Sequence, residues 1–427
     1  MRSAFVSFVV IALWSPALWA KATLANAGSD HVHRLGGQLS HMLLATASLW
    51  LIAAGLSWRA TRSNTGLVIQ SRWKLTHVLP ASLQLVIFCY WGLYWRALPL
   101  FLPALGLQVL WAYGLDAALQ IAKKGKWTLS AGPIPIVLSS NLIVLFDVHS
   151  WPLSLLVVTV AIGSRSWLRR AGRHVFNPSA LGVAAVGALN LLWPDLGYGD
   201  RAHEFSIPPH MTELVLLLAL IVQIRLPVVL VTGGATLSLW GLRHLGLHVL
   251  SPEWAPVTLI LLLFITDPAT TPKTQIGRLL FGGLVGLLMG LMGHGLEAIG
   301  YSDFYAKVLP LPLVNVASPW LDDAGRWLVE RVKPIERPLA RQWNWAHVAL
   351  WLLLMVPSLM VSQRPRPFDT AATIAHHREN QTPFVNFEGA TISCQQSPMY
   401  CGPFRFDLEL RAWLSSPSGR GHSGSGR

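Results

Sequence analysis

Charged side chains are scarce in this sequence. Asp, Glu, Lys and Arg make up 12% of its 427 residues, about half of the roughly 25% that is typical of soluble domains. Acids are the rarer sign, with 20 Asp and Glu against 33 Lys and Arg, so the formal net charge is +13. The deficit of charge excludes an ordinary soluble protein, and an apolar content of 52% excludes disorder, except in the Ser-, Gly- and Arg-rich end from Ser415 to Arg427.

Cysteine is also rare, with three residues, and the recurring signatures of catalytic and metal sites are missing. The sequence has no cysteine quartet for an iron–sulfur cluster, no phosphate-binding glycine loop and no His-Glu-x-x-His motif. We therefore predict no metal site and assign no catalytic residue. Cys89 lies in an apolar segment and is expected to be a small buried hydrophobe. Cys394 and Cys401 are expected to form a disulfide if the polar tail is exported.

Long apolar runs dominate the rest of the chain. A helix needs about 20 residues to cross a bilayer, and about twelve apolar segments approach that length. The 20 Trp residues fit the same environment, because Trp collects where a membrane meets water. We predict an all-α polytopic membrane protein with helices at approximately 41–57, 77–95, 98–121, 130–147, 151–164, 178–194, 212–224, 226–243, 255–268, 279–298, 304–320 and 346–362.

The basic residues give an independent test of this division. They cluster in six alternate loops, as expected for loops that face the cytoplasm. This pattern predicts an inner-membrane protein whose tail, from Gln363 onward, lies on the exported side. The six clusters are Arg59, Arg62, Arg72 and Lys74; Lys123, Lys124 and Lys126; Arg165, Arg169, Arg170 and Arg173; Arg225; Lys273 and Arg278; and Arg326, Arg331, Lys333, Arg337 and Arg341.

The first 27 residues have the form of an export signal. Arg2 precedes an apolar run, and small residues end at Ala25-Asn26-Ala27, where cleavage is expected. An uncleaved first transmembrane helix is the alternative, because a single Arg makes a thin positive region.

Two polar interruptions, both at the basic side, carry the candidate site. The first runs from Phe176-Asn177-Pro178-Ser179 to Gly182, and the second combines Ile265-Thr266-Asp267-Pro268-Ala269-Thr270 with Gly277-Arg278-Leu279 and the residues to Gly282. Asn or Asp before Pro is a good helix start, so both segments could serve only as caps. Matching interruptions in two halves of a membrane protein also indicate an internal binding site, and helix N-termini attract anions. The spacing alone leaves both readings open.

This pair of segments resembles the two signatures of the Rnf-type D subunit, a family that includes the B subunit of the sodium-pumping NADH:quinone oxidoreductase and relatives associated with enediyne clusters. The similarity covers residues 77–322, including Asp116, the loop Lys123-Lys124-Gly125-Lys126 and a closing helix from Val308 to Asp322. It implies a core of ten helices in two inverted halves, with one extra helix on each side. It also implies electron transfer through flavin, coupling to ion movement, and other membrane and peripheral subunits as partners.

The resemblance implies a flavin site, FMN or riboflavin, formed by Asn177, Pro178, Ser179, Gly182, Thr266, Asp267, Thr270 and Arg278. Family members usually attach FMN to the Thr of a Ser-Gly-Ala-Thr-like motif in an exported loop. The corresponding loop here, 193–210, contains no Thr, so a non-covalent flavin is expected. Thr236 and Thr391 follow similar Gly-Ala pairs and are the two alternative attachment sites.

Asp116 is a costly ionisable residue inside an apolar segment, and it could line an ion path, pair with a basic group or reach the membrane surface. Two functions remain in view: a subunit of a flavin-dependent oxidoreductase complex, and a non-redox scaffold or small-molecule transporter with the same fold. Nothing indicates nucleic-acid binding. The chain divides into a signal at 1–27, an extra helix and loop at 28–76, the core at 77–322, a basic loop at 323–345, an extra helix at 346–362 and the tail at 363–427.

Overall fold

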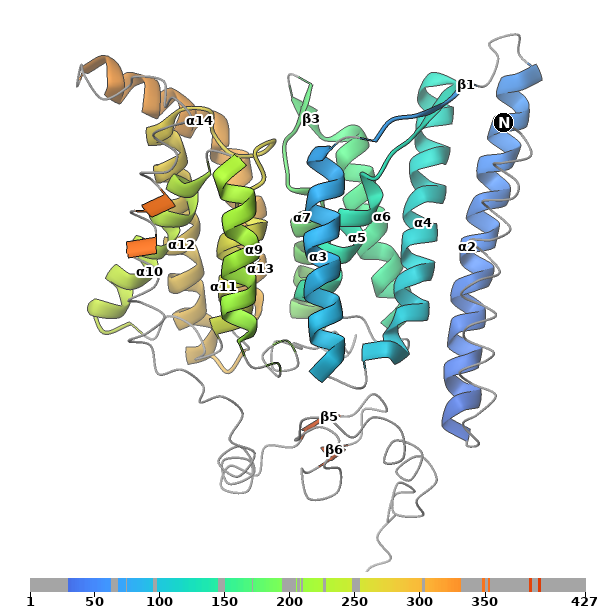
Figure 1. Ribbon diagram of the computed structural model, residues 1–427, viewed down its shortest axis with the longest axis horizontal. Helices are drawn as coiled ribbons and strands as arrows, with labels where there is room; N and C mark the ends of the chain where they lie inside the picture. The colour runs from blue at the N-terminus through green and yellow to red at the C-terminus, as the bar shows by residue number, and fades with distance from the viewer. Residues whose placement is uncertain are drawn as a thin grey trace, which may run out of the picture.

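A computed structural model describes residues 30–331, apart from short gaps, and four short pieces beyond them. The gaps are 63–67, 74, 95–97, 145–149, 171, 194–204, 206–207, 209, 226–227, 248–253 and 302–303, and the pieces are 348–349, 352–353, 384–385 and 391–392. The described chain is a bundle of helices (Figure 1). The expected export signal, Cys394 and Cys401 lie outside the described residues, as does most of the expected helix at 346–362.

Among the described residues, four helices are long and apolar enough to cross a membrane. Their spanning parts are Gly36–Arg62 of α2 (Asp30–Arg62), His77–Tyr94 of α3 (Leu75–Tyr94), Phe101–Lys124 of α4 (Leu98–Lys124) and all of α12 (Gln275–Ala298). Large apolar side chains remain exposed on them, among them Leu51, Leu93 and Leu291. A helical bundle with such outward-facing residues has the surface of a membrane protein, which confirms the predicted class in its coarse form.

The helices form two successive groups with the same internal packing. The first group is α3, α4, α5 (Pro133–Ile143), α6 (Trp151–Trp167) and α7 (Pro178–Leu192). The second is α9 (Met211–Arg225), α10 (Val229–His244), the short α11 (Trp254–Leu259) continued by the π-helix η3 (Ile260–Phe264), α12, α13 (Phe304–Val308) and α14 (Pro310–Arg331). In the first group α3 packs on α5, α4 on α6, and α6 on α7; in the second α9 packs on α11, α10 on α12, and α12 on α14.

Three short two-stranded ladders lie in the connections. β1 (Val68–Ser71) pairs in parallel with β2 (Lys126–Leu129), β3 (Arg169–Arg170) pairs with β4 (Arg173–His174) in a hairpin, and β5 (Phe384–Val385) pairs with β6 (Thr391–Ile392). Gly172 turns the β3–β4 hairpin at a φ of 77°, a conformation that favours glycine.

Glycines bring helices of each group into close contact. A Cβ on Gly182 of α7 would lie 2.5 Å from the carbonyl oxygen of Val157 on α6. In the second group, a Cβ on Gly282 of α12 would collide with the carbonyl oxygen of Val231 on α10, and Gly286 meets Ala235 one turn further on in the same way. Small residues at this spacing let membrane helices pack backbone against backbone.

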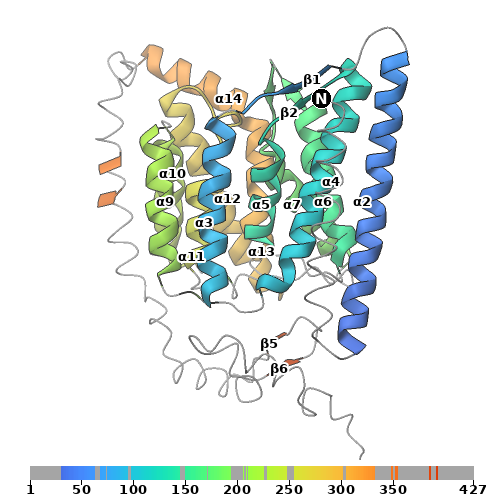
Figure 2. The ribbon, with the colours of Figure 1, turned by 45° about the vertical axis from the view of Figure 1, so that its right-hand side comes forward.

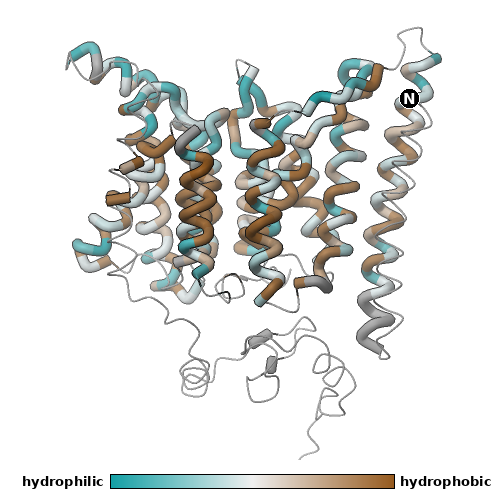
Figure 3. Tube along the Cα trace, viewed as in Figure 1, coloured by the Kyte–Doolittle hydropathy of each residue, from teal (hydrophilic) through white to brown (hydrophobic). Residues whose placement is uncertain are grey.

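The basic connections gather at one end of the bundle. β1 and β2 join the segment after α2 to the end of α4, and Lys123 at the end of α4 donates to the carbonyl of Ser166 on α6 at 3.4 Å. Figure 3 shows hydrophilic segments collected at this end. Trp58 and Trp167 are exposed near it, as expected for side chains at a membrane–water boundary.

The structure differs from the sequence expectations at three places. The segment 304–320 is not one helix, because the chain breaks at Leu309 and starts α14 with Pro310. α14 then continues to Arg331, so the first part of the expected loop at 323–345 is helical; no proline follows Pro319 until Pro334 to stop it. Cys89 is exposed on α3, so the expectation that it is buried was wrong: it faces outward among apolar neighbours, where a small hydrophobe needs no burial in protein.

Candidate functional site

The side chain of Asn177, in the first signature, binds the residue directly before the second signature. Asn177 caps α7: its Oδ1 accepts a hydrogen bond from the backbone N–H of Ala180 at 3.3 Å and from Ser179 Oγ at 2.9 Å. Its Nδ2 donates to the carbonyl oxygen of Phe264 at 3.0 Å, and its backbone N–H donates to Asn315 Oδ1 on α14 at 3.1 Å. One buried residue therefore joins α7 to η3 and to α14. We call Asn177, Phe264 and Asn315 the junction.

Phe264 needs an outside partner because a helix ends there. The last carbonyls of a helix lack partners within it. Within the π-helix, the carbonyl oxygen of Ile260 accepts a hydrogen bond from the backbone N–H of Ile265, which satisfies only one of these carbonyls. Side chains supply more: Thr232 Oγ1 of α10 donates to Leu261 O at 3.0 Å, and Thr266 Oγ1 donates to Leu262 O at 2.8 Å. The π-helical turn is thus held by hydroxyl and amide groups, which is how a break in a membrane helix is satisfied.

The Asp-Pro turn after η3 is held by hydrogen bonds between its own residues. Asp267 Oδ1 accepts from the backbone N–H of Ala269 at 2.9 Å, and the Asp267 carbonyl accepts from the N–H groups of Thr270 and Thr271. Thr270 Oγ1 lies 3.4 Å from Asp267 Oδ2. Asp267 therefore acts as the cap of its own turn.

The carboxylate of Asp322, on α14, binds the backbone directly before α12. Asp322 Oδ1 accepts from the N–H groups of Lys273 and Thr274 at 2.7 and 2.8 Å, and from Thr274 Oγ1 at 3.0 Å. Thr274 in turn caps the helix through Gly277 N. Asp322 therefore fixes the two residues directly before α12, and Thr274 caps the helix itself.

The predicted site residues lie in several places. Asn177, Pro178 and Ser179 at the start of α7 meet the end of η3 through the bond to Phe264. Thr266, Asp267 and Thr270 follow η3 in the chain, and Arg278 lies in the first turn of α12. Arg278 Nε donates to Pro272 O at 3.0 Å, and Arg173 lies close enough to Asp267 and Arg278 for their charges to interact. Gly182 instead packs on α6. Thr236 is buried in the middle of α10, and Thr391 lies in β6.

Asp116 belongs to a second polar cluster, within the first group of helices. Its Oδ2 accepts from Gln120 Nε2 at 2.7 Å, and its charge interacts with Arg165 of α6. Gln120 Oε1 accepts from Thr128 N, and the guanidinium of Arg165 packs on Gly132 before α5. Through Gln120, Asp116 is part of a hydrogen-bond chain that joins α4 to β2.

His174 lies on the β4 strand beside this cluster. Burial, with the positive charges of Arg165 and Arg169, lowers its pKa from the ordinary 6.5 to about 4. The imidazole is therefore neutral at pH 7.

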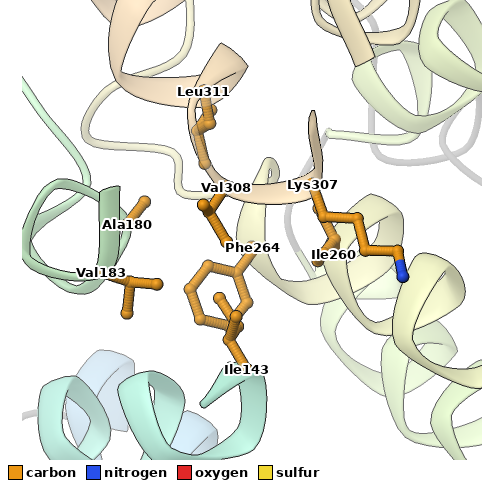
Figure 4. Close-up of a pocket in the computed structure, with 8 residues that line it drawn as sticks. All are labelled: Ile143, Ala180, Val183, Ile260, Phe264, Lys307, Val308 and Leu311. Carbon is orange, nitrogen blue, oxygen red and sulfur yellow. The ribbon is translucent and has the colours of Figure 1, made fainter. Parts of the chain in front are cut away.

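A small cavity lies directly beside the junction. Residues of α7, η3, α13 and α14 line it together with Ile143, the last residue of α5, and Figure 4 shows Phe264 in the middle of these side chains. Its volume of about 10 Å³ is room for about one water molecule. Lys307 on α13 also lines it and is 4% exposed, the one buried Lys among the described residues. Sequence reasoning missed Lys307, although the rule that singled out Asp116 applies equally to it.

The interior of the junction does not fit a flavin. The hydrogen-bonding groups of Asn177, Ser179 and Thr266 are engaged by the protein itself, and the adjoining cavity is too small for a tricyclic ring. The rim of the junction is different, because Arg173 is exposed and Arg278 is half-buried there. Two guanidinium groups on one rim fit an anionic phosphate.

The sequence matches no protein-family model, and no curated protein is similar enough to it to count as a match.

Proposed function

We propose that this chain is an integral membrane subunit of a flavin-dependent electron-transfer complex, with a core of the Rnf D-subunit type. The observation that carries the proposal is the hydrogen bond from Asn177 in the first signature to Phe264, the residue directly before the second signature. Motifs that served only as caps of two unrelated helices would have no need to meet. Their meeting is the behaviour expected of paired interruptions around one functional centre.

The repeated packing supports a core of ten helices in two inverted halves. α3 to α7 form one half, and α9, α10, α11 with η3, α12 and α14 form the other, with a short third helix in each. After five crossings the chain emerges on the opposite side of the membrane from where it entered. Each helix of the second half therefore runs antiparallel to its counterpart in the first half. α2 then stands outside the core, beside α4 at one edge of the bundle (Figures 1 and 2).

The proposed orientation follows from charge. The end that carries Lys123, Arg169 and Arg173 faces the cytoplasm of a bacterial inner membrane, and the tail beyond residue 362 is exported. The flavin, FMN or riboflavin, binds non-covalently on the cytoplasmic rim, where Arg173 and Arg278 would hold the phosphate if the flavin is FMN. A bound flavin supplies the electron chemistry that the side chains of this chain lack.

Flavin binding by paired variants tests the proposal. In the complex isolated with its native partners, Arg173→Gln combined with Arg278→Gln is expected to lower flavin retention at least tenfold. Arg243→Gln is the matched control, because Arg243 is exposed at the opposite end of the bundle, near the end of α10. Equal retention in the double variant and the control would place the flavin elsewhere.

A non-redox transporter is the second candidate, and the two groups of helices are compatible with it. Transporters built from repeats hold their substrate between the repeats, and the two groups meet at the junction. Uptake of a small molecule into vesicles that contain the flavin-free protein would support this candidate. Loss of electron transfer in a folded Asn177→Ala variant would count against it.

A further inference from the structure

The exposed bases at the helix ends of the first group are not balanced by acids. Between Arg72 and Arg170 the sequence contains two acids: Asp116 is buried, and Asp147 lies outside the described residues. Exposed Lys and Arg side chains lie at or just beyond the helix ends in this interval, and within the described part of the chain none of them forms an ion pair with an acid. We call these bases the basic platform: Arg72, Lys123, Lys124, Lys126, Arg169 and Arg170.

The segments that carry the basic platform are fixed to one another. β1 and β2 pair along their whole length, and the backbone N–H of Arg72 donates to the carbonyl oxygen of Leu129 at 2.9 Å. Lys123 Nζ, at the end of α4, donates to the carbonyl oxygen of Ser166 on α6, shortly before the β3–β4 hairpin. A surface that is ordered before binding loses little conformational entropy when a partner docks.

The orientation of the chain in the membrane does not account for the lack of acids. At the same end of the bundle, the second group keeps acids among its bases: Asp323 pairs with Arg326, and Asp322 binds the backbone of Lys273. Asp and Glu have little influence on membrane orientation, so acids would be tolerated in the first group as well. A basic surface without acids is the complement of an acidic partner, because opposite charges across an interface give specificity and fast association.

The basic platform lies over helix ends and not along the sides of the bundle. In Figures 1 and 2 the β1–β2 ladder and the β3–β4 hairpin both lie beyond the start of α3. Lipid surrounds the sides of a helical bundle and reaches only the margin of its ends. The exposed Trp58 and Trp167 mark this margin, and Arg169 and Arg170 follow Trp167 in the chain. The position of the basic platform therefore favours a soluble partner over a lipid.

We propose that the basic platform docks an acidic soluble protein. The β3–β4 hairpin ends at His174, shortly before Asn177, so the docked protein lies beside the rim that carries Arg173 and Arg278. This identification rests on the function proposed above: the acidic protein is the partner that exchanges electrons with the flavin at that rim.

Binding of labelled poly-L-glutamate tests the charge of the platform. Fluorescence anisotropy measures its affinity for the full-length protein in phosphatidylcholine nanodiscs. Lys124→Gln, Lys126→Gln and Arg170→Gln together are expected to weaken binding at least about tenfold, because charge attraction supplies most of the affinity. The matched control combines Lys273→Gln, Arg326→Gln and Arg331→Gln, which removes the same charge from exposed positions at the same end and is expected to change binding little. Equal losses in the two triple variants would overturn the proposal.

The native complex identifies the partner. The complex is isolated from native membranes and exposed to rising salt, while native mass spectrometry records the subunits that remain. The platform variant is expected to release an acidic soluble subunit at lower salt than the wild type and the control variant do, and to retain flavin, since none of its three changes is at the rim.

Two results of this experiment would overturn the proposal: release of every subunit at the same salt concentration in all three proteins, or earlier release only of a subunit that is not acidic. Protein that contains no flavin but binds poly-L-glutamate at the platform would instead refute the proposed function and leave the docking surface intact.

The depth of the platform separates a soluble partner from a lipid. A fluorophore is attached at Gln70→Cys on β1, which is exposed and neutral, with Cys89, Cys394 and Cys401 replaced by Ser. The protein is placed in nanodiscs that contain phosphatidylglycerol. Quenching by acrylamide in the water, with little quenching by lipids that carry a nitroxide near the headgroup, is the expected result. The reverse pattern would show that lipid headgroups cover the platform and would overturn the proposal.

Discussion

The side-chain amide of Asn177 donates a hydrogen bond to the carbonyl oxygen of Phe264 at 3.0 Å, across 87 positions of the sequence. The same residue caps α7 and binds Asn315, so three helices depend on it.

Asn177→Ala is expected to lower stability by about 2–4 kcal/mol, because it removes the cap and leaves the Phe264 carbonyl without this donor. Asn177→Asp separates the two roles: it keeps the cap but cannot donate to Phe264, so part of the loss should remain. Thermal unfolding in detergent measures both. An unchanged melting temperature for Asn177→Ala would contradict the role of the junction.

Gly282→Ala is expected to cost about 1–3 kcal/mol, because its new Cβ collides with the carbonyl of Val231, a backbone atom that cannot move aside. Gly233→Ala is the matched control in α10, since nothing lies within 4 Å of a Cβ there. The control should be stabilised by up to about 1 kcal/mol. Similar unfolding temperatures for the two variants would refute close packing of α10 on α12.

Asp322→Ala should destabilise the protein by about 1–3 kcal/mol, since the amides of Lys273 and Thr274, directly before α12, lose their acceptor. Asp323→Ala, one residue further on, removes only an exposed pair with Arg326 and should cost less than about 0.5 kcal/mol. Denaturation of both variants under the same conditions makes the comparison. A larger loss of stability in Asp323→Ala than in Asp322→Ala would contradict the role assigned to Asp322.

His174 gives the fold a dependence on pH. Its pKa is about 4 when folded and about 6.5 when unfolded, so the unfolded chain binds the proton more readily. The contribution of His174 to the free energy of unfolding is fully present above pH 6.5 and is lost as the pH falls toward 4. The total loss is roughly 2–3 kcal/mol. Unfolding of the wild type and His174→Gln between pH 4 and 8 should show a weaker pH dependence in the variant. Parallel curves would contradict this assignment.

Much of the fold could be predicted from apolar runs and alternating charge, because lipid requires long apolar helices and the basic loops mark their ends. The ends of α4 and α7 lie within three residues of the ends of the predicted segments 98–121 and 178–194. The predicted segment 279–298 covers most of α12. The break at Leu309 and the extension of α14 were missed, since both depend on packing. Gly325 can continue the helix there because it lies against Thr274, far away in sequence.

The candidate site could be predicted only as two separate motifs. The Asn-Pro and Asp-Pro steps both predict helix starts, but only Asn177-Pro178 begins a helix; Asp267 closes a turn, and α12 starts at Gln275. The partners Phe264, Asn315 and Asp322 carry no local signal. The sequence also predicted free helix N-termini for an anion, whereas the side chains of Asn177 and Thr274 cap α7 and α12. Lys307 was detectable as a charge within an apolar run, but its place at the cavity between the two groups follows only from the fold.

Flavin content is the most direct measure of the central proposal. The protein is purified from native membranes together with its partners, and its cofactors are identified by absorbance and by mass after denaturation. We predict a stoichiometric flavin that is released from the chain, leaving the mass of the chain unmodified at Thr236 and Thr391. Protein that retains its partners but contains no flavin would contradict the account.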